Sequence, residues 1–151
     1  MKYTLDILIE APLEVCAKKF SITEYMNHWH RGLVSIEHLS GIPNELGSKM
    51  KLHYKIGGLN LNQIETITHK NLPHELHCSY ATKDLDHLQD NFFTATSQNQ
   101  TKWTSVNECV PLNFNMRIKL WLMPKTFKKQ SLQAMKDFKN FVENGTSVAH
   151  A

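Results

Sequence analysis

The sequence lacks any long apolar run, so it holds no candidate for a membrane-spanning helix, which needs about 20 consecutive apolar residues. Its first residues, MKYTLDILIEAP, also lack an apolar core behind a basic head, and their alternation favours a β-strand over a signal peptide. We therefore expect a cytoplasmic protein. Repeats, low-complexity segments and linkers are absent as well, so the 151 residues predict one domain over 1–151.

Cysteine is scarce, and the three cysteines, Cys16, Cys78 and Cys109, are widely spaced without a CxxC pair. An odd number of distant cysteines in a reducing compartment predicts free, buried thiols. An excess of one charge is missing too. The net charge of +3 is too small to indicate nucleic-acid binding, and we expect none. The nine histidines make the real charge sensitive to pH near neutrality.

The motifs of familiar catalytic and metal sites are also missing. There is no GxSxG nucleophile motif and no HExxH, so catalytic residues stay unknown at this point. The histidines within 28–30 and 74–78 match no closed zinc spacing, so we expect no metal site, although a site assembled from distant segments stays open. No cofactor is implied.

What the sequence does contain is an ordered series of patterns. Residues 2–10 alternate as a half-buried strand, and two short helices follow across residues 12–29. A last amphipathic helix is predicted at 125–143, and residues 145–151 are expected to form a frayed tail. Between them, six strands separated by turn signals predict an antiparallel meander at 33–41, 47–56, 59–69, 74–82, 87–97 and 101–111.

Three segments carry further expectations. Ser21 to Glu24 fits a capping box that would begin the second short helix. Residues 112–123 alternate like a strand but could equally form a buried helical turn, and both alternatives stay open. The basic face of the last helix could dock on anionic lipid, but such faces are more often solvated, and we expect no membrane contact. Its lysines are Lys125, Lys128, Lys129, Lys136 and Lys139.

The chain resembles one protein family over most of its length, from about residue 2 to residue 144. The residues that carry the resemblance are Ile9 to Val15, Trp29, Gly32 to Gly41, Gly47, Glu65 with Pro73, Pro124 to Ser131 and Phe138 to Glu143. In this order they are similar to the START-like (SRPBCC) superfamily, in its branch of small bacterial polyketide cyclase/dehydrase-like proteins.

The resemblance implies an α+β helix-grip fold. In this fold a seven-stranded antiparallel sheet wraps a long C-terminal helix, and two short helices after the first strand plug one end. The resemblance also implies a hydrophobic ligand cavity between the sheet and the long helix. It does not imply one activity, because the superfamily includes lipid carriers, hormone receptors, aromatase/cyclases, hydrolases and partners of other proteins.

The residues expected to line that cavity are mostly aromatic or methionine, two types that suit adaptable apolar pockets. Tyr25 and Trp29, on the second short helix, would gate the entrance. The expected lining is Tyr25, Met26, Trp29, Met50, Leu52, Tyr54, Glu65, Tyr80, Phe92, Trp103, Met116, Leu120, Met123, Phe127 and Met135.

Five polar strand residues could turn inward and orient a ligand, although each could instead face solvent. A buried Glu65 would then carry a raised pKa. The five are Glu65, Tyr80, Asn91, Thr94 and Asn107.

The leading functional hypothesis is binding of a small hydrophobic molecule, lipid-like or aromatic, without strong catalysis. An enzyme of the cyclase, dehydrase or hydrolase type is the alternative, and inward polar groups with a perturbed carboxyl or histidine would favour it. A protein–protein interaction module is a third possibility, which a filled core and an exposed apolar patch would favour. Ligand identity, oligomeric state and pathway stay open.

Overall fold

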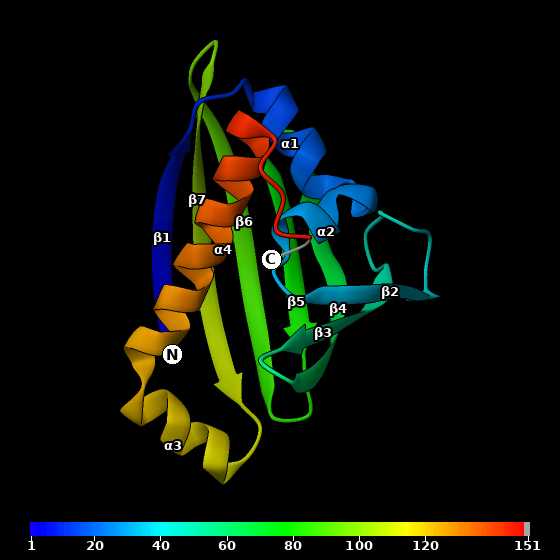
Figure 1. The fold of residues 1–151 in the computed structure, drawn as a ribbon, viewed down its shortest axis with the longest axis vertical. Helices are drawn as coiled ribbons and strands as arrows, with labels where there is room; N and C mark the ends of the chain where they lie inside the picture. The colour runs from blue at the N-terminus through cyan, green and yellow to red at the C-terminus, as the bar shows by residue number, and fades with distance from the viewer. Residues whose placement is uncertain (150–151) are drawn as a thin grey trace.

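A seven-stranded antiparallel sheet curls around one long C-terminal helix in the computed structural model, which describes residues 1–149 (Figure 1). The strand order β1-β7-β6-β5-β4-β3-β2 pairs the first strand with the last, and the remaining neighbours follow in sequence. The predicted helix-grip fold is confirmed. The strands are β1 Lys2–Ile9, β2 Leu33–Ser40, β3 Lys49–Ile56, β4 Leu59–Asn71, β5 Glu75–Ala81, β6 Leu85–Ser97 and β7 Gln100–Pro111. The helices are α1 Leu13–Ser21, the 3-10 turn η1 Thr23–Tyr25, α2 Met26–Trp29, α3 Phe114–Leu122 and α4 Pro124–Asn144. Within residues 1–149, no helix is long and apolar enough to cross a membrane.

The main core lies where α4 crosses the concave face of the sheet beside β1 (Figure 1). Phe138 of α4, Trp103 of β7 and Phe20 of α1 are almost completely buried there. Their ring centroids are 5.2 Å apart for Phe20 and Trp103 and 5.3 Å apart for Trp103 and Phe138, both in edge-on contacts that aromatic pairs favour. The apolar faces of α1 and α4 therefore meet in one aromatic core.

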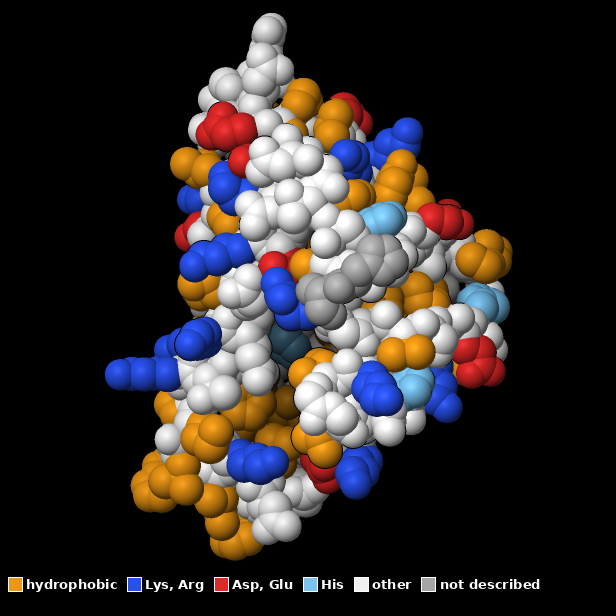
Figure 2. All heavy atoms as spheres, viewed as in Figure 1, with side chains coloured by type: hydrophobic (Ala, Val, Ile, Leu, Met, Phe, Trp, Pro, Cys, Tyr) orange, Lys and Arg blue, Asp and Glu red, His pale blue; other side chains and the backbone are white. Residues whose placement is uncertain are grey.

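Residues 112–123, for which the sequence left two alternatives open, are mainly helical. Asn113 begins α3, because its side-chain oxygen accepts the N–H of Met116 at 2.8 Å, and its amide donates to Asp84 at 2.6 Å. Leu120 packs inward against Tyr3 and Cys109. Met116 is partly buried in the same cluster, whereas the remaining large apolar side chains of this segment face outward. Figure 2 shows hydrophobic side chains gathered at the end of the molecule where α3 lies.

The predicted capping box is wrong. Helix α1 continues through Ser21, whose hydroxyl donates to the carbonyl of Lys18 at 3.4 Å, and η1 then begins without a side-chain cap. Serine hydroxyls often bond back to their own helix in this way, and such a hydroxyl is no longer free to cap the next one.

The expected frayed tail is also wrong for the described residues 145–149. Gly145 ends α4 in a left-handed conformation, with φ of 69°. The N–H of Val148 then donates to the carbonyl of His28 at 3.0 Å, and the Val148 side chain is buried. Ser147 Oγ lies 2.9 Å from Nδ1 of the same histidine. The tail therefore packs against α2, whereas residues 150–151 lie outside the described part.

Candidate functional site

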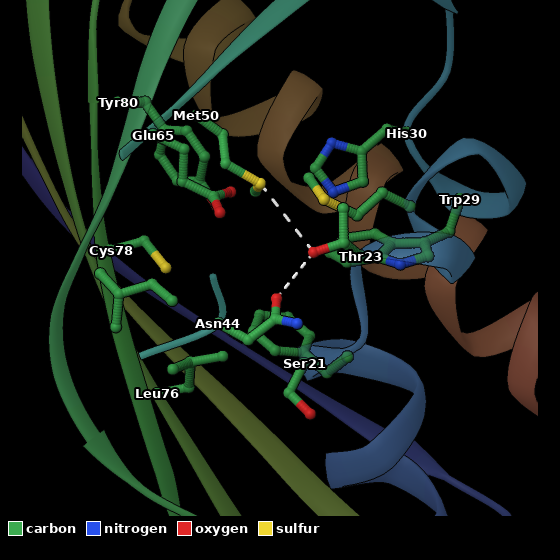
Figure 3. A pocket seen from close by; sticks show the side chains of 13 residues that line it. Ser21, Thr23, Trp29, His30, Asn44, Met50, Glu65, Leu76, Cys78 and Tyr80 are labelled. Atoms are coloured by element: carbon green, nitrogen blue, oxygen red, sulfur yellow. Dashed lines mark hydrogen bonds between the residues drawn. The ribbon is translucent and has the colours of Figure 1, made fainter. Parts of the chain in front are cut away.

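A small pocket lies between the η1–α2 segment and the inner face of the sheet (Figure 3). Met26, Trp29 and His30 line it from the helical side, and residues of β3, β4 and β5 line it from the sheet. Its volume is about 20 Å³, which is room for about one water molecule. The full lining is Phe20, Ser21, Thr23, Met26, Trp29, His30, Asn44, Met50, Glu65, Ile67, Leu76, Cys78 and Tyr80.

Glu65 on β4 places a carboxyl group inside this pocket. Only 7% of the residue is exposed, and Figure 3 shows the carboxyl pointing toward the centre of the pocket. None of the ion pairs among residues 1–149 includes Glu65. Desolvation raises the pKa of Glu65 to about 7, and a hydrogen bond from Tyr80 offsets part of this effect. A carboxyl group with this pKa exists in both protonation states at neutral pH.

His30 faces the same pocket from the end of α2. Its Nδ1 lies 2.8 Å from the hydroxyl of Tyr54, while its Nε2 is buried without a hydrogen-bond partner. Gln63 donates to the Tyr54 oxygen at 3.4 Å, which favours the arrangement in which the Tyr54 hydroxyl donates to Nδ1. Burial lowers the pKa of His30 to about 4, so the ring is neutral at physiological pH. Its Nε2 is then an unused N–H donor.

The η1 segment is fastened over the pocket by polar contacts. The Thr23 hydroxyl donates to Oδ1 of Asn44 at 2.7 Å, and it lies 3.9 Å from the sulfur of Met50 (Figure 3). Asn44 belongs to the loop between β2 and β3 and adopts a left-handed conformation, with φ of 66°. Asparagine tolerates this conformation better than most residues. The contact joins the helical plug to the sheet side.

Further polar groups continue along the inner face of the sheet from Tyr80. His87 Nε2 lies 2.7 Å from Oδ1 of Asn107, and its ring centroid is 6.1 Å from that of Tyr80. Burial lowers the pKa of His87 below its usual value. Asn91 is fully buried and accepts the indole N–H of Trp103 at 2.9 Å. This polar band satisfies its own hydrogen bonds, in contrast to His30.

The structure brings together only part of the predicted lining. Five of the predicted residues line the pocket, namely Met26, Trp29, Met50, Glu65 and Tyr80. Leu52 and Tyr54 pack beside it with the two methionines, and Tyr25 packs partly buried on Phe141. Trp103 and Met135 belong to the aromatic core, and Met116, Leu120 and Phe127 pack with Tyr3 beneath α3.

Two predicted lining residues and one predicted polar residue point elsewhere. Phe92 lies on the outer face of the sheet beside His77, because Asn91 and Phe93 of β6 are the buried pair. Thr94, two residues further along β6, lies on the same outer face of the sheet as Phe92 and is exposed. Met123 is 47% exposed, because it separates α3 from α4 and belongs to neither helix's buried side. For Asn91 and Asn107, whose orientation the sequence left open, the structure shows buried, inward-facing side chains.

Trp29 lies in the core rather than at an opening. It is 6% exposed, and its ring centroid lies 5.2 Å from that of Phe20 and 4.9 Å from that of Phe138. A side chain held between two rings in this way is a poor gate, so the gating role predicted for Trp29 does not fit its position.

His30 is the main pocket residue that the sequence prediction missed. Its role depends on a contact with Tyr54, 24 positions further along the chain. The only local signal is its position at the end of a short helix, directly after Trp29. Cys78 was predicted as a buried thiol, which is confirmed, but its place in the pocket was not predicted.

A larger cleft lies at the other end of the molecule, between α3 and the turn that joins β5 to β6. Its volume is about 460 Å³. Unlike the inner pocket, it is open to solvent and mainly polar, and only Met116 connects it to the apolar cluster beneath α3. Its lining is Lys83, Asp84, Asn113, Asn115, Met116 and Lys119.

Comparison with known proteins identifies the fold. No protein-family model matches the sequence, and no curated protein matches it either. Among solved structures, a conserved protein from Geobacillus kaustophilus aligns with a TM-score of 0.76 at 15% identity, covering 94% of this chain and 95% of that one. Ara h 8.0201 aligns with a TM-score of 0.72 at 13% identity, covering 94% and 97%. The ginseng major latex-like protein 151 from Panax ginseng aligns with a TM-score of 0.67 at 14% identity, covering 92% and 95%.

The chain therefore shares the helix-grip fold of these solved structures. At such low identities the likeness concerns the fold alone. It carries no substrate, and function has to be argued from the residues of the site.

Proposed function

We propose that this protein binds a small, mostly apolar molecule with one polar group in the interior between the sheet and the η1–α2 plug. The observation that carries the proposal is the Glu65 carboxyl, which is buried, has no cationic partner and points into a pocket where apolar side chains such as Met26 and Met50 lie beside a few polar groups (Figure 3). The hypothesis of a small hydrophobic ligand, lipid-like or aromatic, becomes more specific, because Glu65 offers a polar anchor.

A buried carboxyl group is difficult to explain by packing. Transferring it from water costs several kcal/mol unless it is paired or neutralised, and a leucine at this position would avoid the cost. Groups with strongly shifted pKa values in clefts are candidates for functional sites. Glu65 and the unused N–H of His30 face the same space, so together they offer an acid and a hydrogen-bond donor to one polar group.

The pocket must enlarge before it can hold such a ligand. Its volume of about 20 Å³ is far below the ~300–1,000 Å³ of typical ligand sites. The side chains that fill the space include Met26 and Met50, which are flexible and adapt readily to new contacts. We propose that entry separates Thr23 from Asn44 and moves the η1–α2 plug.

The test compares two naphthalene probes that differ only in an amine. At pH 8, 1-naphthylmethylamine should bind the wild type about tenfold more tightly than 1-methylnaphthalene, a difference of about 1.4 kcal/mol. Glu65→Gln should abolish this preference, while Glu37→Gln, which changes an exposed strand glutamate, should keep it. Exclusion of both probes, or a preference that survives in Glu65→Gln, would overturn the proposal.

A second candidate is an enzyme that transfers a proton within the pocket. The specific observation in its favour is the pairing of a carboxyl of pKa about 7 with a neutral histidine whose pKa is lowered to about 4. Such opposite shifts mark acid and base roles in many active sites. Turnover of naphthyl esters that disappears in both Glu65→Gln and His30→Gln would support this candidate. Probe binding without turnover would leave binding as the function.

A further inference from the structure

The outward face of α3 and the residues beside it form an exposed apolar surface. Trp121 is 79% exposed, Phe114 71% and Leu122 64%. Leu112, Ile118 and Met123 are exposed as well. Apolar side chains this large and this close together are uncommon on the surface of a soluble protein unless something covers them. We call these six residues the α3 patch.

The patch is presented by a fixed helix. Asn113 caps the first turn of α3, and Leu120 anchors its other side against Tyr3 and Cys109. At the end of α3, Pro124 occupies the first turn of α4 and so fixes the junction. The exposed side chains are therefore a surface of the folded protein and do not come from a frayed segment.

The charged residues within α3 and the first half of α4 are all positive. From residue 109 to residue 136 the chain contains six basic residues and no aspartate or glutamate. Five of them lie on α3 or the first two turns of α4 and are exposed, namely Arg117, Lys119, Lys125, Lys128 and Lys129. Figure 2 shows basic side chains beside the hydrophobic ones at this end of the molecule. One acidic residue, Asp84, lies beside the start of α3, where its carboxylate accepts a hydrogen bond from the side-chain amide of Asn113.

We propose that the α3 patch docks on the surface of a bilayer that contains anionic lipid. An aromatic and aliphatic helix face surrounded by lysine and arginine matches the boundary between acyl chains and negatively charged headgroups, where tryptophan is favoured. A protein partner would need to supply acidic groups around an apolar groove, whereas an anionic bilayer supplies both at once. The expectation of no membrane contact rested on the basic face of α4, whereas the α3 patch adds exposed apolar side chains beside basic ones.

The protein itself contains a suitable reporter. Of its three tryptophans, Trp29 and Trp103 are buried in the core, so a change in emission on binding reports mainly on Trp121. Vesicles of phosphatidylcholine with an equal part of phosphatidylglycerol should shift the emission to the blue and sediment the protein. Vesicles of pure phosphatidylcholine should bind at least about tenfold more weakly, and added salt should reduce binding.

Matched variants test the assignment. Trp121→Ser with Leu122→Ser should weaken sedimentation with the anionic vesicles at least about tenfold. Leu59→Ser, which removes a residue that is 76% exposed on the β3–β4 hairpin, should leave it unchanged. Failure to bind, or binding that the α3 variant retains, would overturn the proposal. A dimer in solution that the α3 variant converts to a monomer would also overturn it, because a second copy would then cover the patch.

A different observation points to a metal site on the outer face of the sheet. A bulge in β4 between Ile67 and His69 reverses the parity of the strand, so His69 faces outward opposite His77 of β5. Their rings are stacked with centroids 5.0 Å apart. Glu75 lies on the same face, with its carboxylate oxygens 3.0 Å from His69 Nε2 and 4.0 Å from His77 Nε2.

The geometry points to a surface site for Zn²⁺ formed by these two histidines and Glu75. Their ligand atoms all lie within 4.8 Å of one another, and tetrahedral zinc needs separations of about 3.3 Å, so small side-chain rotations suffice. His77 Nδ1 now accepts the N–H of Asn91 at 3.0 Å and would have to give up this contact. Asn91 remains paired with Leu76 in the β5–β6 ladder, which limits the free-energy cost of losing the contact with His77.

Calorimetric titration of the full chain with zinc chloride tests this site. One ion should bind, and His69→Gln and His77→Gln should each weaken it at least about tenfold. His53→Gln, which removes a half-buried histidine of β3 that contacts Asn60, should have no effect. Cobalt should give the visible absorption of tetrahedral coordination. An absence of binding, or equal binding in the His77 and His53 variants, would overturn this assignment.

Discussion

Arg31 and Asp137 form a two-point ion pair that joins the segment after α2 to the middle of α4. The Arg31 Nε lies 3.1 Å from Oδ2 of Asp137, and its Nη2 lies 2.9 Å from Oδ1. Gln133 donates to the same carboxylate at 3.0 Å. Asp137 is 4% exposed, whereas about half of the Arg31 side chain is in solvent. Asp137 therefore depends on Arg31 for its pairing in the interior, whereas water can solvate Arg31 without Asp137.

This asymmetry predicts unequal effects of substitution on the free energy of unfolding. Arg31→Met leaves a buried carboxylate with Gln133 as its remaining side-chain donor, and we expect a loss of about 3 kcal/mol. Asp137→Asn keeps one acceptor and releases an arginine that water can solvate, so we expect about 1 kcal/mol. Urea unfolding at pH 7 measures both. As a control, Lys2→Met should cost below about 0.5 kcal/mol, because its pair with Glu108 is exposed. Equal losses for Arg31→Met and Asp137→Asn would contradict this account.

Glu65 predicts a loss of stability with rising pH. Its pKa is about 7 in the folded protein against 4.5 as the reference value, so the folded state holds its proton longer than the unfolded chain. The stabilising contribution is present below about pH 4.5 and is lost as pH rises through 7, by roughly 3 kcal/mol in total. Glu65→Gln should therefore gain stability relative to the wild type between pH 5 and 8, measured by urea unfolding. Parallel pH profiles would show that the carboxyl is not desolvated.

His30 predicts the opposite dependence. Its pKa is about 4 when folded and 6.5 as the reference value, so its contribution is present above pH 6.5 and is lost as pH falls through 4. Between about pH 4.5 and 6.5 the contributions of His30 and Glu65 oppose each other. The wild type should therefore vary little there, and His30→Gln should lose stability as pH rises across this window. The same urea series tests it, and parallel profiles for the wild type and His30→Gln would contradict the burial of this ring.

The fold could be predicted because its signals are local. Alternating strands, the closing amphipathic helix and the paired glycines between β3 and β4 each act within a few residues. Gly57 and Gly58 have φ of 56° and 83°, the left-handed geometry that a tight hairpin turn requires. Strand alternation made an inward position available to Glu65 but left a solvent-facing position open; in the structure the residue is buried, and desolvation raises the pKa of its carboxyl group.

The site could be predicted only in part, because strand parity depends on features that a sequence hides. Phe92 and Phe93 are identical side chains, and nothing local shows which of them faces inward. Nothing in the sequence indicates the bulge that turns His69 outward either. The roles of His30 and Val148 depend on their contacts with Tyr54 and His28. Both contacts form only when distant segments of the chain come together in the fold.

Trp29 and Trp121 allow the stability contribution of a buried tryptophan to be compared with that of an exposed one. Trp29 is 6% exposed among aromatic rings, and Trp121 is 79% exposed on α3. We expect Trp29→Ala to lower the free energy of unfolding by about 3–5 kcal/mol through the cavity it leaves. Trp121→Ala should change it by less than about 0.5 kcal/mol. Thermal or urea unfolding of both variants tests the comparison. A mild effect at Trp29 with altered probe binding would restore this residue as a gate, whereas a severe loss of stability would place it in the structural core.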